Sequence, residues 1–482
     1  MRERHLLSDE AIRSFIVDGY VQVRADFPNG FHQSVYEQIE MLMKGQGNPG
    51  NNLLPILPDI QKVYSHPAVT GALSSLLGPN YIMHPHRYCH LNSPGSKDQN
   101  WHKDDYVFDK NIRHHRYRWV MAFYYPQDVS EDMGPTGLLP GKQFNNQISD
   151  DHASLATESA CSLSGEAGTV SIVNFDVWHR ATPNLSEKKR YMLKFNFLRV
   201  EEPDMPSWDH SEPAWQPVEN DRHDGLSNSV WHWLRGSNNG ATGTVGKSEV
   251  RPLVEKLIDR DEHEDARLDY AYELACCNEA VLPLLVAALK EEAIQTADKN
   301  VEKSPSNVGG GNPSDLYTAH ALSAIGEPAV PLLMDLLKKD EWPIRAAASG
   351  ILGNIGPAAR NAAPALAENL GHANWWVRRN AAEALGTIGS IGGKGIPELN
   401  HLLEDDTEPV ARNAAIAIGK IAQPTDGAVD ALRNLLSHEN RYTRFHASVA
   451  LKRLGTPEAM EVLVDNLFAA RWCPITTNKA PY

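Results

Sequence analysis

The sequence predicts a multidomain chain with a β-rich N-terminal part followed by α-helical repeats. Three observations support this fold class. Residues 169–200 carry strand-like patterns, residues 340–456 repeat with a period of 33, and the total length of 482 residues exceeds a single hydrophobic core. The expected segments are residues 1–205, a Trp-rich connection at 206–247, repeats at 248–470 and a tail at 471–482.

Two segments of the N-terminal part are typical of strands. Thr169–Trp178 (TVSIVNFDVW) is rich in β-branched and aromatic residues and is expected to deliver His179 from its end. In the second segment the residues alternate between two faces: Arg190, Met192, Lys194 and Asn196 on one, and the apolar Tyr191, Leu193, Phe195 and Phe197 on the other. With the turn Thr182-Pro183-Asn184 between them, we expect a hairpin whose polar face lies on the His179 side.

Two histidines and an aspartate are candidates for a metal site. His102 and Asp104 lie two residues apart, so in an extended segment their side chains point to one face and reach one ion. Together with His179 they would leave three open positions on an octahedral metal, which is the facial triad of non-heme Fe(II) oxygenases. Arg190 follows eleven positions after His179 and offers a bidentate cation to a dicarboxylate co-substrate.

The His-x-Asp motif alone carries little weight. The chain has 20 histidines, and His263-Glu264-Asp265 has the same form in a polar, helix-like setting. The interpretation therefore depends on the combination of an extended segment, a second histidine that ends a strand, and an arginine on the following strand.

Several motifs occur in order along the first 200 residues. They are Leu7-Ser8-Asp9-Glu10, Phe15, Asp18-Gly19-Tyr20-Val21, Pro94-Gly95, Trp101-His102-Lys103-Asp104, Gly134–Gly141 (GPTGLLPG) and His179…Pro183-Asn184…Arg190. In these motifs the segment resembles the phytanoyl-CoA dioxygenase family of Fe(II)/2-oxoglutarate oxygenases. The resemblance implies a double-stranded β-helix (jelly-roll, cupin-like) domain. It also implies that His102, Asp104 and His179 bind iron, and that Arg190 binds the distal carboxylate of 2-oxoglutarate.

The resemblance further implies an oxidoreductase that uses Fe(II), 2-oxoglutarate and O2, oxidises a small organic molecule and releases succinate and CO2. Asp104 favours hydroxylation, because similar halogenases have a small residue in place of the carboxylate. Two departures concern contacts to the co-substrate and substrate. Lys142-Gln143 replace a usual Ser-His pair, and Ala181 replaces a small hydroxyl residue. Thr182 beside it and Lys194, which shares a face with Arg190, are candidate co-substrate contacts.

The second half repeats at a shift of 33 residues. The repeated columns include Ile344, Val377, Val410, Thr443; Ala348, Ala381, Ala414, Ala447; Leu333, Leu366, Leu399, Leu432; and Gly356, Gly389, Ala422, Gly455. The glycine column is expected at the C-cap of the first helix of each unit. Each unit reads as a helix pair, and the pattern V-R-x-x-A-x-x-A-L-G-x-I-G resembles HEAT-like repeats. We expect an α-solenoid, with weaker units upstream at Asp265–Leu289 and Leu316–Leu337.

Four further segments have open interpretations. The connection 201–247, with Trp208, Trp215, Trp231 and Trp233, reads as an interdomain packing strap, with a lid over the active site as the alternative. Residues 302–314 read as a flexible surface loop. Residues 106–118, with Arg113, His114, His115, Arg116 and Arg118, read as a solvated loop, or as an anion-binding segment. Strand alternation explains His84, His86 and His90 better than a second metal site.

Composition limits the partners. A net charge of −15 argues against nucleic acid and anionic membranes as generic partners, and no apolar run reaches membrane-spanning length. Five cysteines give no disulfide framework, so we expect a cytoplasmic protein. The repeats are expected to bind a protein partner or to self-associate. The alternative to an enzyme is a HEAT-repeat scaffold whose oxygenase module binds a ligand or hydroxylates a partner protein.

Overall fold

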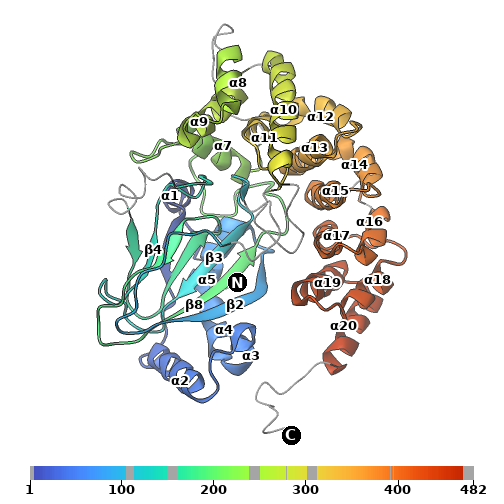
Figure 1. Ribbon diagram of the computed structural model, residues 1–482. Helices are drawn as coiled ribbons and strands as arrows, with labels where there is room; N and C mark the ends of the chain where they lie inside the picture. The colour runs from blue at the N-terminus through green and yellow to red at the C-terminus, as the bar shows by residue number, and fades with distance from the viewer. Residues whose placement is uncertain are drawn as a thin grey trace. The chain divides into compact units, whose positions relative to one another are not determined.

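The protein forms two compact units in the computed structural model (Figure 1). The structure describes residues 5–104, 113–148, 160–237, 250–277, 279–300, 312–390, 392–393 and 396–469. Of these, residues 5–104 and 117–222 belong to the first unit, and residues 113–116 and 223–469 to the second. Among the described helices, none combines the length and the apolar character needed to cross a membrane.

The first unit is built on two open antiparallel sheets. Its described strands are β1 (Tyr20–Arg24), β2 (Ile82–Asn92), β3 (Trp119–Tyr124), β4 (Thr136–Leu138), β5 (Cys161–Leu163), β6 (Thr169–Asn174), β7 (His179–Ala181) and β8 (Arg190–Leu198). The larger sheet has the order β1-β6-β3-β8-β2 and the smaller one β5-β4-β7. The expected mixed α and β architecture is therefore present, and the closure of the two sheets into a jelly roll stays a prediction.

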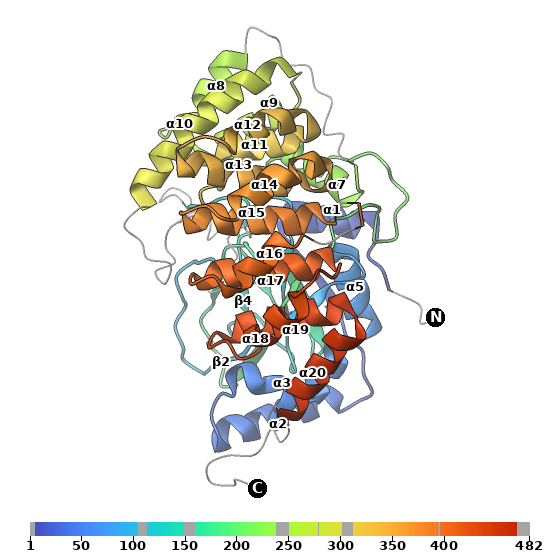
Figure 2. The same ribbon diagram turned by 90° about the vertical axis from the view of Figure 1, so that its right-hand side faces the viewer.

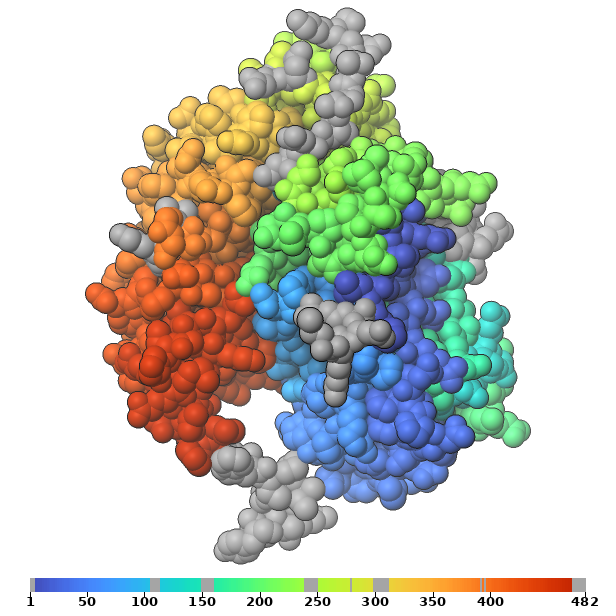
Figure 3. Space-filling model, turned by 180° about the vertical axis from the view of Figure 1, so that it is seen from behind, coloured from blue at the N-terminus to red at the C-terminus, as the bar shows by residue number. Residues whose placement is uncertain are grey.

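Helices cover the apolar face of the larger sheet. They are α1 (Asp9–Asp18), α2 (Phe31–Gly45), α3 (Leu53–Ile56), α4 (Asp59–Tyr64) and α5 (Pro67–Leu77), with a 3-10 turn η1 (Gly50–Asn52). This helical layer forms the blue surface in Figure 3. The Tyr64 ring packs on Phe195 of β8 at 4.3 Å between centroids, and its hydroxyl donates to the Leu193 carbonyl at 3.1 Å. The alternation predicted along β8 is thus confirmed, with its aromatic side chains under the helices.

The predicted strand Thr169–Trp178 and its hairpin with the next strand are wrong in part. Strand β6 ends at Asn174, where a turn is closed by the Val177 N–H, which donates to the Asn174 carbonyl at 3.2 Å. The chain then enters the smaller sheet, where β7 pairs with β4, whereas β8 pairs with β2 and β3 in the larger sheet. His179 and Arg190 therefore lie on strands of different sheets.

The second unit is helical. Its described helices are α7 (Asp224–Leu234), α8 (Val250–Ile258), α9 (Glu264–Ala275), α10 (Leu282–Asn300), α11 (Tyr317–Ile325), α12 (Val330–Leu336), α13 (Trp342–Ile355), α14 (Ala363–Asn369), α15 (Trp375–Ile388), α16 (Glu398–His401), α17 (Glu408–Ile421), α18 (Ala428–Leu435), α19 (Arg441–Leu454) and α20 (Pro457–Ala469). The 3-10 turns are η3 (Glu279–Val281), η4 (Glu327–Ala329), η5 (Gly356–Ala362) and η6 (Leu402–Glu404). Helices α13, α15, α17 and α19 pack in sequence against one another (Figure 2).

The glycine column of the repeats falls at the predicted C-caps. Gly356, Gly389 and Gly455 end α13, α15 and α19, and each donates its backbone N–H to the carbonyl four residues earlier. Ala422 ends α17 in the left-handed region, with φ 54°, and is the one non-glycine residue of the described chain with positive φ. The helical repeat was therefore correctly predicted at the level of helices and caps, while the superhelical form of the array stays a prediction.

Of the predicted solvated loop 106–118, residues 106–112 lie outside the described residues, and residues 113–116 are not a solvated loop, because His114, His115 and Arg116 are buried. They are part of the second unit, where the His115 ring stacks on His320 at 3.9 Å and its Nδ1 lies 2.7 Å from the Tyr272 hydroxyl. The Arg116 guanidinium donates to the carbonyls of Asn354, at 2.6 Å, and Ser323, at 3.3 Å. The prediction was wrong because it assumed that charged side chains stay in solvent. The guanidinium of Arg116 is instead satisfied inside the protein by carbonyls at helix ends.

The connection between the halves divides at residues 222 and 223. Trp208 lies in the first unit and donates its indole N–H to Asp9 at 2.6 Å, while Trp231 and Trp233 lie on α7 of the second unit. The roles of strap and lid stay predictions. Asn312 is buried and hydrogen-bonded to Asn380, so this end of the predicted surface loop is interior. The remainder of that loop, residues 302–311, and the tail 471–482 lie outside the described residues.

Candidate metal site

The backbone brings the two predicted histidine ligands together. His102 and His179 form an antiparallel β-bridge, in which each N–H donates to the carbonyl of the other at 3.1 and 3.0 Å. His179 is the first residue of β7, whereas His102 lies in an extended segment that forms only this bridge. Opposed residues of such a bridge carry neighbouring side chains, and the two imidazole centroids are 4.5 Å apart.

Asp104 completes the cluster. One potential ligand atom from each of His102, Asp104 and His179 lies within 4.8 Å of the others. Asp104 Oδ2 is 3.9 Å from His179 Nε2, which is a separation that a metal ion between them would bridge. Within the described part of the chain, this is the single group of three or more histidine, cysteine or acidic side chains so arranged. His84, His86 and His90 accordingly form no second cluster there.

Hydrogen bonds fix the orientation of both imidazoles. The Nδ1 atom of His102 lies 2.9 Å from the Asn100 carbonyl, and that of His179 lies 3.0 Å from the Val177 carbonyl. A carbonyl only accepts, so the proton resides on Nδ1 and Nε2 carries the lone pair that a metal needs. Burial also lowers the pKa of His179 to about 4, which keeps this ring neutral and ready to bind a cation. Sequence reasoning missed both carbonyls because backbone acceptors leave no residue-type signal.

Two lysines hold acidic groups at the site. Lys194 of β8 donates from Nζ to Asp104 Oδ2 at 2.7 Å, with both side chains less than a tenth exposed. Lys103 donates to Asp176 at 2.6 Å. Lys194 was predicted to share the face of Arg190, and here it contacts the carboxylate of the cluster.

Arg190 lies buried on β8, with 2 % of its surface exposed. Its Nε and one terminal nitrogen donate to the Gly134 carbonyl at 2.9 and 2.6 Å, and the guanidinium carbon is 5.9 Å from the centroid of the Tyr125 ring. Among the described residues, no carboxylate pairs with this guanidinium. A buried cation without an anion is costly, so the position favours an anionic ligand.

Thr182 lies beside the same turn. Its hydroxyl donates to the Pro135 carbonyl at 2.6 Å, and its own carbonyl accepts from Asn92 at 2.9 Å. Thr182 thus ties the end of β7 to the segment that carries Gly134, the acceptor for Arg190. The motif Gly134–Gly141, noted in the sequence, therefore contributes to the surroundings of the guanidinium.

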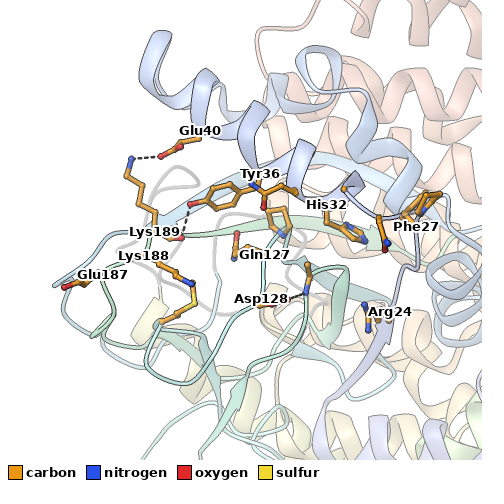
Figure 4. Close-up of a pocket in the computed structure, with 17 residues that line it drawn as sticks. Arg24, Phe27, His32, Tyr36, Glu40, Gln127, Asp128, Glu187, Lys188 and Lys189 are labelled. Atoms are coloured by element: carbon orange, nitrogen blue, oxygen red, sulfur yellow. Dashed lines mark hydrogen bonds and ion pairs between the residues drawn. The ribbon is translucent and has the colours of Figure 1, made fainter.

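A separate cavity of about 680 Å³ lies beside α2 (Figure 4). None of the predicted site residues lines it. Its His32 bonds to Tyr124, which points to the face of β3 opposite Phe123 and the metal cluster. The cations Arg24 and Lys189 at this cavity already pair with Glu166 and Glu40. The cavity is therefore distinct from the candidate metal site.

Comparisons with known proteins agree with the sequence motifs. Residues 38–192 match the family model of phytanoyl-CoA dioxygenase, and residues 330–418 and 396–471 match HEAT repeats. No curated protein matches the chain.

Similar solved structures include the following three, all of low identity. The non-heme α-ketoglutarate-dependent carbocyclase SnoK from nogalamycin biosynthesis is 16% identical, with 40% of this chain and 85% of that chain covered and a TM-score of 0.33. HygX from Streptomyces hygroscopicus, with nickel and 2-oxoglutarate bound, is 16% identical, with 40% and 88% covered and a TM-score of 0.34. AviO1 from Streptomyces viridochromogenes is 15% identical, with 43% and 96% covered and a TM-score of 0.33. On the family matches, the chain carries a phytanoyl-CoA dioxygenase domain followed by HEAT repeats.

Proposed function

We propose that the protein is a non-heme Fe(II)/2-oxoglutarate-dependent oxygenase that hydroxylates a small organic molecule. The observation that carries this proposal is the convergence of two orientated imidazoles and one carboxylate within 4.8 Å. Two histidines and a carboxylate are the donor set of non-heme iron oxygenases. Iron(II) bound there with 2-oxoglutarate and O2 supplies the oxidation of a C–H bond, with release of succinate and CO2.

The residues of the cluster have separate roles in this proposal. His102 and His179 bind the metal through Nε2, because their Nδ1 atoms are engaged by carbonyls. Asp104 binds through its carboxylate, which Lys194 holds in place from the other side. Three protein ligands leave positions for the keto acid end of 2-oxoglutarate and for O2. We also infer that the sheets close into a double-stranded β-helix, since the His102–His179 bridge ties the segment after β2 to the smaller sheet.

Arg190 is the proposed anchor for the distal carboxylate of 2-oxoglutarate. Its guanidinium is buried and has no described carboxylate partner, so a dicarboxylate supplies the missing negative charge. Lys194 is a second proposed cationic contact of the co-substrate. Thr182 is the weaker proposal, since its hydroxyl would have to exchange its bond to the Pro135 carbonyl for one to the ligand.

The test needs no substrate. Fe(II) and then 2-oxoglutarate are titrated into the anaerobic protein while the visible charge-transfer band of the chelate is recorded. We expect the band in the wild type and its loss in His102→Ala and Asp104→Ala. His263→Ala is the matched control, because His263 belongs to the other His-x-Asp sequence and caps α9 instead. A folded wild-type protein without the band would overturn the proposal.

Arg190 is tested in the same titration. Removing a charge-assisted bidentate contact costs about 1.5–3 kcal/mol, so Arg190→Ala should need roughly 10- to 100-fold more 2-oxoglutarate for half-saturation. The affinity for Fe(II) alone should not change, because Arg190 is not a ligand. An unchanged requirement for 2-oxoglutarate would exclude Arg190, and Lys194 would be examined next.

A protein-binding scaffold is the second candidate function, and one surface feature favours it. Helix α20 exposes Met460, Val464 and Leu467, which recur at helical spacing on one face. HEAT repeats with an exposed apolar face fit a protein partner or a second copy of the chain. Light scattering across a concentration series tests self-association: a constant monomer mass would leave a different protein as the partner.

A further inference from the structure

His90 lies on the same face of the larger sheet as the two cations of the site. In the β2–β8 pairing, His90 opposes Met192, Asn92 opposes Arg190, and Tyr88 opposes Lys194. Directly opposed residues of antiparallel strands point to one face, and so do residues two apart on one strand. We call each opposed pair of residues a row. The row of His90 and Met192 therefore lies between the row of Asn92 and Arg190 and the row of Tyr88 and Lys194.

The environment of His90 is unusual for a histidine with no assigned role. Its Nε2 atom is buried and has no hydrogen-bond partner in the described part of the protein. By contrast, His102 and His179 each have one ring nitrogen bonded to a carbonyl. A buried polar atom that lacks a partner is destabilising, so such an atom in a folded protein calls for an explanation.

The imidazole of His90 is neutral at physiological pH. Burial lowers its pKa to about 3, and the nearby cations Lys194 and Arg190 act in the same direction. A neutral imidazole has one N–H donor, and Nε2 is the buried nitrogen that faces no protein acceptor. In the tautomer that carries the proton on Nε2, this nitrogen donates to an acceptor supplied from outside the described protein, and next to two cations that acceptor is best an anion.

The position of His90 along the strand indicates which anion this is. A dicarboxylate that binds a metal beside Asp104 and extends to Arg190 runs from the row of Lys194 to the row of Arg190. The row of Met192 and His90 is adjacent to both of these rows, so it neighbours the carboxylates at the two ends of the ligand. On the larger sheet, His90 supplies the polar side chain of this middle row, since Met192 carries only a thioether.

We propose that His90 binds 2-oxoglutarate, by donating a hydrogen bond from Nε2 to a carboxylate oxygen of the ligand held between the metal and Arg190. The inference rests on the proposed function, because it requires that 2-oxoglutarate binds at this cluster. It assigns His90 to the co-substrate, apart from the metal ligands. His90 thus sets the affinity and placement of the dicarboxylate without changing the affinity for iron.

The test compares two substitutions in the anaerobic titration of the Fe(II)-loaded protein with 2-oxoglutarate. His90→Leu removes the donor, and we expect the Kd for 2-oxoglutarate to rise about tenfold. His90→Gln keeps an N–H donor of similar reach, so its Kd should stay within about threefold of the wild type. Tyr88→Phe is the control on the same strand face and should match the wild type. The Kd for Fe(II) measured before 2-oxoglutarate is added should be equal in all four proteins.

A second measurement uses the intact wild-type side chain. In the diamagnetic Zn(II)-loaded protein labelled with 15N-histidine, addition of 2-oxoglutarate should shift the Nε2–H resonance of His90 downfield. The resonance is assigned by its absence in His90→Gln. This measurement decides the question even if His90→Leu fails to fold.

The possible failures are distinguishable. A chelate band in the wild type, together with an unchanged Kd in His90→Leu or an unmoved His90 resonance, would overturn the role of His90 alone. If the wild type itself forms no chelate, the proposed function and the role of His90 fall together.

Discussion

Lys194 Nζ lies 2.7 Å from Asp104 Oδ2, so the carboxylate proposed as an iron ligand is paired with a lysine of the neighbouring sheet strand β8. Both side chains are nearly buried. The lysine neutralises the carboxylate when no metal is bound, and it keeps one oxygen of Asp104 from turning away. A divalent cation at the site must therefore share Asp104 with an existing positive charge.

Replacing Lys194 with methionine should weaken the metal-free protein and strengthen metal binding. The substitution removes the lysine partner of a nearly buried carboxylate, which costs about 3 kcal/mol of unfolding free energy. A bound divalent cation supplies the missing charge, so Mn(II) should raise the Tm of Lys194→Met more than that of the wild type. Thermal unfolding with and without Mn(II) measures both effects. A smaller Mn(II)-induced shift in the variant would show that positioning by Lys194 outweighs its charge.

The helical unit should lose stability at alkaline pH through His223. Burial alone would lower the pKa of this histidine, but the carboxylates of Asp265, 3.6 Å from Nε2, and Asp269, hydrogen-bonded to Nδ1, raise it from 6.5 to about 9. A raised pKa in the folded state stabilises the protein fully below pH 6.5, and the contribution disappears as the pH rises through 9. Because Asp269 is half-exposed, we expect a loss of about 2 kcal/mol.

Urea unfolding of the helical unit between pH 6 and 10 measures this dependence, and His223→Gln provides the comparison. The variant should be less stable than the wild type at pH 6 and should lose less between pH 6 and 10. Parallel profiles for the two proteins would mean that other groups cause the alkaline loss.

Two glycines of the repeats, Gly386 and Gly419, allow close helix packing, and they should differ in their tolerance of alanine. A Cβ on Gly386 would lie 2.8 Å from Cβ of Ala417, whereas one on Gly419 would lie 3.6 Å from Cβ of Ala450. Overpacking should therefore make Gly386→Ala destabilising by about 1–3 kcal/mol. In Gly419→Ala, the better helix propensity of alanine should offset most of the strain. Urea midpoints of the two variants decide this, and equal midpoints would contradict the difference in spacing.

Replacing Ala422 with glycine should increase the stability of the helical repeats. It is the C-cap of α17 with φ 54° and ψ 31°, a conformation that costs an L-residue about 1 kcal/mol. The equivalent C-cap of α19 is Gly455, with φ 63° and ψ 10°. Ala422→Gly should raise the unfolding free energy by about 0.5–1 kcal/mol, and Gly455→Ala should lower it by a similar amount. If Ala422→Gly lowers the urea midpoint, the alanine makes contacts that outweigh its backbone strain.

Much of the candidate site was predictable because its residues sit at fixed local spacings. Backbone geometry places the side chains of His102 and Asp104 on one face because they are two residues apart in an extended segment. The repeat period of 33 residues likewise predicted the helix pairs of the second half. The prediction was wrong where one apolar run spans two elements. Residues 169–178 look like one strand, yet the chain turns after Asn174 and leaves one sheet for the other. The place of His179 in the smaller sheet depends on a partner distant in sequence, Leu138, with which it pairs.

Local composition also misled the interpretation of the segment after the metal site. Residues 113–116 carry charged and imidazole side chains, which are usually solvated. Their burial depends on helices more than 200 residues later in the chain, which a single sequence does not place. The sequence did not indicate the role proposed for His90, because the burial of its Nε2 atom next to Arg190 and Lys194 depends on the pairing of β2 with β8.

Because residues 113–116 belong to the helical unit, that unit is built from two separate segments of the sequence. The loop is encoded inside the stretch that matches phytanoyl-CoA dioxygenase, yet Arg116 bonds to the ends of α11 and α13. During synthesis, His115 and Arg116 leave the ribosome long before the helices that bury them, so this part of the core forms late. An exchange of the repeat array by recombination would also have to exchange this loop, and the two halves are therefore expected to be inherited together.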